Sequence, residues 1–117
     1  MAQLREPGGK TREIKYAAIS GATSGNNTLV AAVTGKKIRV LAYTLISDSN
    51  VDVRFEDGAG GTALTGQMEV GTSSDSGGLV VPYCPVGHFE TSAGTLLNLE
   101  LSGAVQTSGH LTYEEVE

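Results

Sequence analysis

The sequence has no tryptophan, one cysteine, three prolines and only six aromatic residues in a chain of 117. A single thiol, Cys84, cannot form an intrachain disulfide, so the fold must rest on its own packing. A chain of this length buries roughly 65% of the surface that its unfolded form exposes. We therefore expect one domain with an adequate core, which needs neither disulfides nor a structural metal nor a cofactor in order to fold.

Long apolar segments are also missing. Glycine, threonine or a charged residue interrupts every hydrophobic stretch within about ten residues, whereas a helix that crosses a bilayer needs about 20. The first twelve residues are polar and include Pro7, so they lack the apolar core of a signal peptide. The formal net charge of -5 gives no overall attraction to nucleic acid or anionic lipid. We expect no membrane span, no nucleic-acid partner and no secretion signal.

Helical periodicity is absent, and period-two alternation recurs instead. Apolar residues alternate with polar ones over residues 51–56 and 97–102, which predicts strands with one buried face. Residues 38–46 are apolar at both odd and even positions, which predicts a central strand covered on both sides. Including the weaker patterns, we expect strands near residues 13–20, 28–34, 36–47, 51–56, 63–70, 78–83, 95–102 and 110–116.

Glycine-rich segments separate these strands, at residues 20–27, 57–61 and 71–78. Glycine supplies the positive φ angles that tight turns require. The Asp57-Gly58 pair and the segment 34–36 predict hairpin turns. The spacing of strands and turns predicts an all-β fold: a single-domain, jelly-roll-like β-sandwich with about eight antiparallel strands over residues 13–117.

Residues 1–12 lack alternation and are predicted to form an extended N-terminal arm. Arg5, Lys10 and Arg12 in this arm, together with Lys15, make up four of the eight basic residues of the chain. Three glutamates lie in the last four residues, so the two ends have opposite charge. We expect the four basic residues to bind carboxylates of a partner protein. Solvated, flexible termini are the alternative interpretation.

Two segments resemble ligand-binding loops but lack required residues. The segment 9–11 matches the end of a phosphate-binding P-loop, yet position 4 is Leu4 rather than glycine, and no strand or helix pattern flanks the segment. Residues 48–52 begin like a calcium loop, but Val53 and Ala59 stand where glycine and glutamate are required. We expect no nucleotide site and interpret residues 48–52 as a turn. Weak cation binding by the oxygen-rich turns stays open.

The sequence also shows no recognisable catalytic set. A reactive Cys84 would need an activating base such as His88 or His110, and the spacing establishes no such proximity. Two histidines without a recurring ligand spacing are weak evidence for zinc. Neighbouring carboxylates such as Glu56 and Asp57 point to opposite faces of a strand, so they do not form an acid/base pair. We expect no enzyme activity, no cofactor and no metal site.

Three segments resemble small virion proteins of tailed bacteriophages: NTLVAAVTGKKIRVL at 27–41, PVGHFET at 85–91 and GHLTY at 109–113. The resemblance extends over roughly residues 16–116 and lies in strand and turn residues rather than in a chemical signature. It implies a head decoration, or cement, protein that binds the major capsid protein on the outer surface of the head and stabilises the capsid lattice. It also implies a homotrimer, because trimers fit the local threefold positions of a capsid.

Three other roles stay open at this point. Tail, baseplate or receptor-binding components of a virion can have similar strands and turns. A carbohydrate-binding module would need exposed aromatic rings, whereas Tyr43, Phe55 and Tyr113 are predicted to be buried. An enzyme would need catalytic residues brought together from distant strands.

Overall fold

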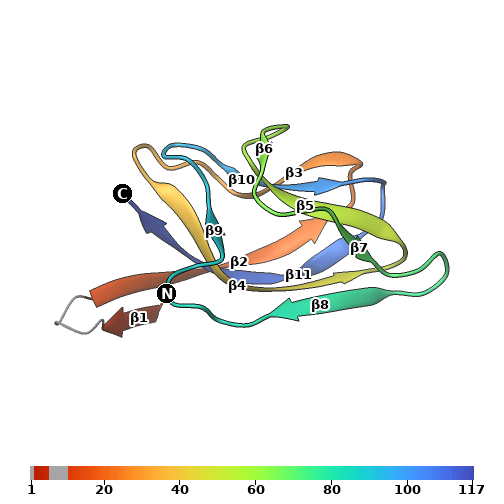
Figure 1. Ribbon diagram of the computed structural model, residues 1–117, viewed down its shortest axis with the longest axis horizontal. Helices are drawn as coiled ribbons and strands as arrows, with labels where there is room; N and C mark the ends of the chain where they lie inside the picture. The colour runs from red at the N-terminus through yellow and green to blue at the C-terminus, as the bar shows by residue number, and fades with distance from the viewer. Residues whose placement is uncertain (1, 6–10) are drawn as a thin grey trace.

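The computed structural model describes residues 2–5 and 11–117, with side chains from residue 12 onward. Every regular element in these residues is a strand, and the strands form two sheets packed face to face (Figure 1). No helix with the length and hydropathy of a membrane span occurs in this part of the chain. The chain is an all-β, single-domain β-sandwich, as the alternation predicts.

The larger sheet has six strands. Their order is β1 (Ala2–Arg5), β2 (Thr11–Gly21), β11 (Thr107–Val116), β4 (Lys37–Ser47) and β8 (Gly77–Val81), with β9 (Phe89–Glu90) also paired to β4. All of these pairs are antiparallel. Among the described residues, β8 is therefore the edge of the sheet on the side opposite β1.

The smaller sheet has five strands. Their order is β3 (Gly25–Val30), β10 (Leu97–Leu101), β5 (Val51–Asp57) and β6 (Thr62–Ala63), with β7 (Met68–Val70) also paired to β5. Each predicted strand overlaps an observed one, and the region 63–70 is divided between β6 and β7. β1 and β9 are not among the predicted strands, because strands of four and two residues carry too few side chains to show an alternation.

The apolar side chains of β4 point in directions that differ from the prediction. Its core-facing positions are even-numbered up to Val40 and odd-numbered from Tyr43 onward. The register with β11 shifts here, which leaves Leu41 as an extra residue, as in a β-bulge. The apolar residues at odd and even positions therefore reflect a switch, at Leu41, in which positions of the strand face the core. The prediction of cover on both sides is wrong at Ile46, which is 53% exposed on the outer face.

The core lies between the two sheets and is centred on three aromatic rings. Phe55 of the smaller sheet contacts two rings of the larger sheet, with centroid distances of 4.8 Å to Tyr43 and 5.0 Å to Phe89. Leu99 lies opposite Phe55 in the β10–β5 register, and both are fully buried. The predicted burial of Tyr43 and Phe55 is confirmed, and Tyr113 is half-buried against the same core.

The two predicted hairpin turns have different outcomes. The turn after Asp57 joins the paired strands β5 and β6, with Gly58 at a φ of 85° that favours glycine. The segment 34–36 also forms a turn, closed by a hydrogen bond from Lys36 N to Val33 O of 3.0 Å. It connects β3 to β4, however, and these strands belong to different sheets. The hairpin prediction is wrong there, because a local turn does not determine which strands pair.

The first described residues extend the larger sheet. Where the sequence predicts an extended arm, β1 pairs antiparallel with the beginning of β2, from Ala2 opposite Ile14 to Arg5 opposite Thr11. Arg12, which the prediction assigns to the arm, lies inside β2. Lys10 is outside the described residues.

Candidate functional site

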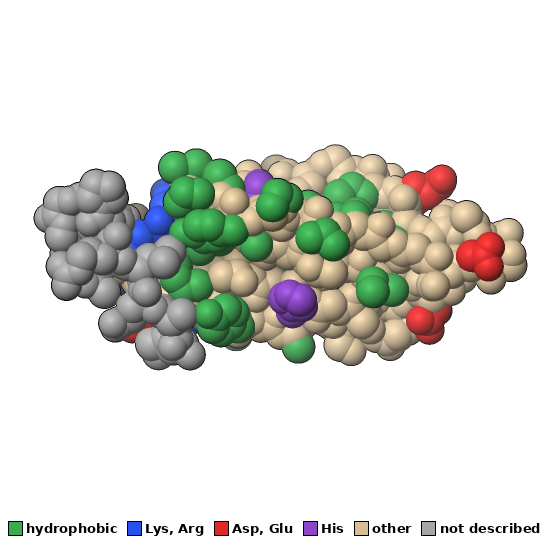
Figure 2. Space-filling model, turned by 90° about the horizontal axis from the view of Figure 1, so that it is seen from below, with side chains coloured by type: hydrophobic (Ala, Val, Ile, Leu, Met, Phe, Trp, Pro, Cys, Tyr) green, Lys and Arg blue, Asp and Glu red, His purple; other side chains and the backbone are tan. Residues whose placement is uncertain are grey.

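The outer face of the larger sheet carries no charged side chain over three consecutive rows of paired residues (Figure 2). The rows consist of Tyr16, Thr112 and Ala42; of Ala18, His110, Thr44 and Val80; and of Ser20, Ser108, Ile46 and Gly78. We call these eleven residues the uncharged face. The rows follow from the register of β2, β11, β4 and β8, so their members are far apart in the sequence.

Five large hydrophobic side chains are exposed in the described part of the chain: Tyr16, Ile46, Val80, Tyr83 and Val86. The first three belong to the uncharged face, and the other two lie between β8 and β9, the strands paired to β4 on that side. On the face in view the hydrophobic side chains gather toward the middle and one end, and most of the visible acidic side chains lie at the other end (Figure 2). Single exposed hydrophobic residues are ordinary, but their concentration on one side marks an interaction surface.

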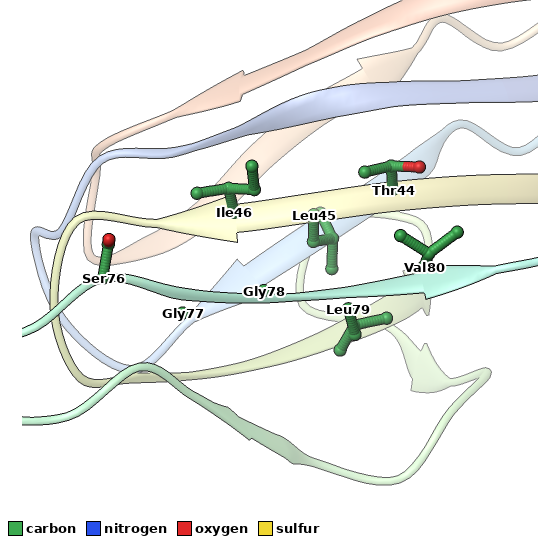
Figure 3. A pocket seen from close by; sticks show the side chains of 8 residues that line it. All are labelled: Thr44, Leu45, Ile46, Ser76, Gly77, Gly78, Leu79 and Val80. Carbon is green, nitrogen blue, oxygen red and sulfur yellow. The ribbon is translucent and has the colours of Figure 1, made fainter.

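A hollow of about 450 Å³ opens beside β8 (Figure 3). It is lined by residues 44–46 of β4 and residues 76–80 at and before β8. Gly78, opposite the outward-facing Ile46, adds no side chain to this hollow, whereas the side-chain position of Gly77 faces the backbone of Gly71. A Cβ atom at Gly78 would lie 2.5 Å from the carbonyl oxygen of Leu45, so the fold requires glycine there. The hollow is therefore built into the pairing of β4 with β8.

The outer face of the smaller sheet has a different chemistry. The amide nitrogen of Asn98 donates to Glu56 Oε1 at 2.9 Å and to Asn26 Oδ1 at 3.0 Å. Arg54 Nε donates to Glu56 Oε2 at 2.7 Å. Asn98 and Glu56 are buried, so these bonds compensate for the removal of both groups from water. Arg54, Glu56, Asn98 and Asn26 are thus directed at one another, and the exposed large hydrophobic side chains lie on or beside the other sheet.

Two of the four basic residues predicted to bind a partner form ion pairs within the chain. Arg12 Nε donates to Glu114 Oε2 at 3.0 Å, and Arg12 Nη2 donates to Pro85 O at 2.7 Å. Lys15 Nζ donates to Glu115 Oε2 at 2.9 Å, and this hydrogen bond raises the pKa of Lys15. The acidic C-terminus thus meets basic residues of its own chain. The side chain of Arg5 and all of Lys10 lie outside the described part, and their role in partner binding stays a prediction.

Glu114 also belongs to a wider ionic cluster at the end of the uncharged face. Arg39 Nη1 lies 3.6 Å from Glu114 Oε1, while Arg39 Nε donates to Glu90 Oε1 at 2.9 Å. Lys37 Nζ lies 3.4 Å from Glu90 Oε2. The hydrogen bond from Arg39, with a smaller contribution from Lys37, lowers the pKa of Glu90. This cluster could not be predicted from the sequence, because four different strands contribute its members.

The cysteine and the histidines have ordinary surroundings. Cys84 is half-buried, and its backbone N–H donates to Leu41 O at 2.9 Å. His88 Nε2 lies 2.8 Å from Pro82 O, and His110 is exposed on the uncharged face. Within residues 2–5 and 11–117, no group of three or more histidine, cysteine, aspartate or glutamate side chains is placed to hold a metal ion. The features that the fold does assemble are the uncharged face, its hollow and the ionic cluster.

Comparison with protein-family models, with curated proteins and with solved structures finds no match for this chain.

Proposed function

We propose that this protein is a structural component of a tailed-bacteriophage virion, a capsid decoration protein that binds the outer surface of the head through its uncharged face. The observation that carries this proposal is that all the large hydrophobic residues exposed in the described chain lie on or beside one sheet. The resemblance of residues 27–41, 85–91 and 109–113 to small virion proteins supports the same role.

The chemistry of the uncharged face suits docking onto a protein lattice. Burial of apolar surface contributes roughly 25 cal/mol per Å², and no charge has to be removed from water over these rows. The sheet beneath is held by the core, so the face is presented in one conformation. A decoration protein that touches adjacent subunits of the major capsid protein stabilises the lattice, because those subunits cannot separate without exposing the contact again.

Two finer features belong to this proposal. A jelly-roll topology is supported by the order of the strands, in which β2 lies beside β11 in one sheet and β3 lies beside β10 in the other. A homotrimer on the local threefold positions of the capsid is the assembly that the resemblance implies. Arg5 and Lys10, predicted from the sequence to bind a partner, would contact carboxylates of a neighbouring protein in this assembly.

A second role, as a tail or receptor-binding part of the virion, is favoured by one observation. Tyr16 is 60% exposed and Tyr83 is 47% exposed, so both rings are accessible for stacking on a sugar. On that alternative the ligand would be a polysaccharide of the host surface instead of the capsid.

The decisive experiment adds a charge to the uncharged face. Ala18→Glu, an exposed position in the central row, should weaken binding to capsids that lack this protein by at least ~tenfold, because an unpaired carboxylate would be buried in the contact. Thr28→Glu, an exposed position on β3 of the other sheet, is the matched control and should leave binding within about twofold. Co-sedimentation with purified capsids measures both.

Equal capsid binding by the two variants would overturn docking through this face. Failure of the wild-type protein to bind capsids, combined with polysaccharide binding that Tyr16→Ala abolishes, would establish the second role instead.

A further inference from the structure

β8 is an unprotected edge strand. Within the described chain it pairs with β4 on one side only, and its five residues, Gly-Gly-Leu-Val-Val, include no charge and no proline. Natural edge strands are usually protected by charged side chains, proline, bulges or a covering segment, because their open N–H and C=O groups otherwise pair with another strand. The register of β8 with β4 is regular over all five residues, so no bulge twists this edge away.

We propose that the edge of β8 is a contact between two copies of this chain, in which the two β8 strands pair antiparallel about a two-fold axis at Leu79. Such a contact would join the two larger sheets into one continuous sheet. It concerns self-association and does not depend on the proposed function.

The shape of β8 is complementary to itself in this register. Pairing centred on Leu79 places Gly78 of one copy opposite Val80 of the other, and Gly77 opposite Val81. Val80 thus faces Gly78, which has no side chain of its own, whereas the side-chain position of Gly77 lies against the backbone of Gly71. Thr44, Ile46 and Val80 point to the same side of the sheet (Figure 3), so Val80 of the second copy would enter the hollow beside Ile46.

The exposed residues indicate what the contact would bury. Val80 is 73% exposed and Ile46 is 53% exposed, although both lie in regular strands with apolar neighbours. In the paired arrangement both side chains would contact the second copy. The backbone groups on the open edge of β8 would gain the hydrogen bonds of an antiparallel ladder.

The charge of the chain does not oppose this contact. Each copy has a net charge of -5, but the acidic residue nearest to β8 in the sequence is Asp75, four positions before Leu79. In the paired strands the two Asp75 residues would be eight positions apart along the ladder, a separation of about 26 Å. This distance exceeds the Debye length of about 8 Å at physiological ionic strength, so their repulsion is largely screened.

The symmetry of the contact agrees with docking on a surface. In an antiparallel pair the two-fold axis is perpendicular to the sheet, so both copies present their uncharged faces on the same side. On a capsid this arrangement would allow both copies to bind at once and would connect copies of adjacent trimers. Only this consequence depends on the proposed function.

Five residues of strand are a small contact, well below the interface area of a tight complex, so we expect weak and reversible pairing. The mass of the purified protein, measured by sedimentation equilibrium over a concentration series, should rise from that of one chain toward that of two. Val80→Lys should raise the dissociation constant at least ~tenfold, since it places a lysine in the hollow of each partner.

Val86→Lys is the matched control for charge and exposure. Val86 is 77% exposed and lies two residues before His88, whose backbone N–H donates to Val40 O of β4, whereas β8 pairs with the other end of β4. This variant should associate like the wild type. Thermal unfolding of both variants establishes that any loss of pairing is not a loss of folding.

The register is tested by cross-linking in a Cys84→Ser background. Leu79→Cys places the two thiols at directly opposed positions, with Cα atoms about 5 Å apart, within the range for a disulfide. Val80→Cys places them diagonally, about 7–8 Å apart, which is too far for efficient bonding. Mild oxidation should therefore yield a covalent dimer for the first variant and much less for the second.

A wild-type chain that stays monomeric at millimolar concentration would overturn the proposal. Dimers or trimers that Val80→Lys and Val86→Lys weaken equally would overturn it as well, because the contact would then lie elsewhere. Preferential cross-linking at position 80 would exclude the register.

Discussion

Arg12 holds Glu114 by two parallel hydrogen bonds, from Nε to Oε2 at 3.0 Å and from Nη2 to Oε1 at 2.5 Å, between positions 102 residues apart in the sequence. The two side chains are only 13% and 6% exposed, so the pair is removed from most of the solvent. Planar guanidinium and carboxylate groups form such paired bonds with well-defined geometry. The contact joins the beginning of β2 to the end of β11, where the ionic cluster borders the uncharged face.

Removal of Arg12 should therefore be costly. Arg12→Ala leaves Glu114 buried with Arg39 as its remaining cationic neighbour among the described side chains, and we expect a loss of about 3 kcal/mol in the free energy of unfolding. Lys15→Ala, which removes a more exposed ion pair of the same strand, should cost less than about 1 kcal/mol. Urea denaturation measures both, and similar losses in the two variants would contradict the assignment of Arg12.

Two N-terminal deletions distinguish the stabilising ion pair of Arg12 from the partner binding predicted for Arg5 and Lys10. An N-terminal arm without intrachain contacts could be removed without loss of stability, but Arg12 is tied to Glu114. Deletion of residues 1–12 should thus lower the thermal midpoint by several degrees more than deletion of residues 1–10, which retains Arg12. Both deletions remove Arg5 and Lys10 and should weaken capsid binding alike. Identical midpoints would show that the Arg12 pair contributes nothing to stability.

The core prediction concerns Leu99, which is fully buried between the sheets. Leu99→Ala should reduce the free energy of unfolding by about 2–5 kcal/mol, because it removes buried methyl groups and leaves a cavity beside Phe55. Leu64→Ala, at a half-buried position on the margin of the same core, should cost clearly less. A loss below ~0.5 kcal/mol for Leu99→Ala would be incompatible with the described packing.

The strands could be predicted from the sequence because the side chains along each strand alternate between water and the core. This alternation is a local property. Leu97, Leu99 and Leu101 show it clearly, and their burial is as predicted. The uncharged face could not be predicted in the same way. Ile46 and Val80 are apolar like the core residues beside them, and only the pairing of β4 with β8 shows that they point outward.

The ionic cluster escaped prediction for a related reason. The opposite charges of the two ends are visible in the sequence, but composition does not show whether they meet within one chain or between chains. The antiparallel register places Lys15 opposite Tyr113, and thereby brings the beginning of β2 beside the end of β11. The partner of Arg12 is therefore determined by topology, which local patterns do not encode.

Acid should destabilise the protein in part through Glu90. The hydrogen bond from Arg39, and then the contact with Lys37, lowers the pKa of this carboxyl in the folded state. Its contribution to stability is fully present above the unfolded-state pKa of about 4.3 and is lost as the pH falls through the lower, folded-state value. Glu90→Gln should consequently reduce stability at pH 7 but lose less between pH 5 and pH 3 than the wild type does.

Glu69→Gln is the control for this measurement, because it makes the same chemical change at an exposed position on β7. The free energy of unfolding from urea titrations at pH 7, 5, 4 and 3 gives both slopes. If Glu90→Gln retained the full acid dependence of the wild type, the ion pairs of Arg39 and Lys37 with Glu90 would not stabilise the folded state, and the acid sensitivity would have to come from other carboxylates.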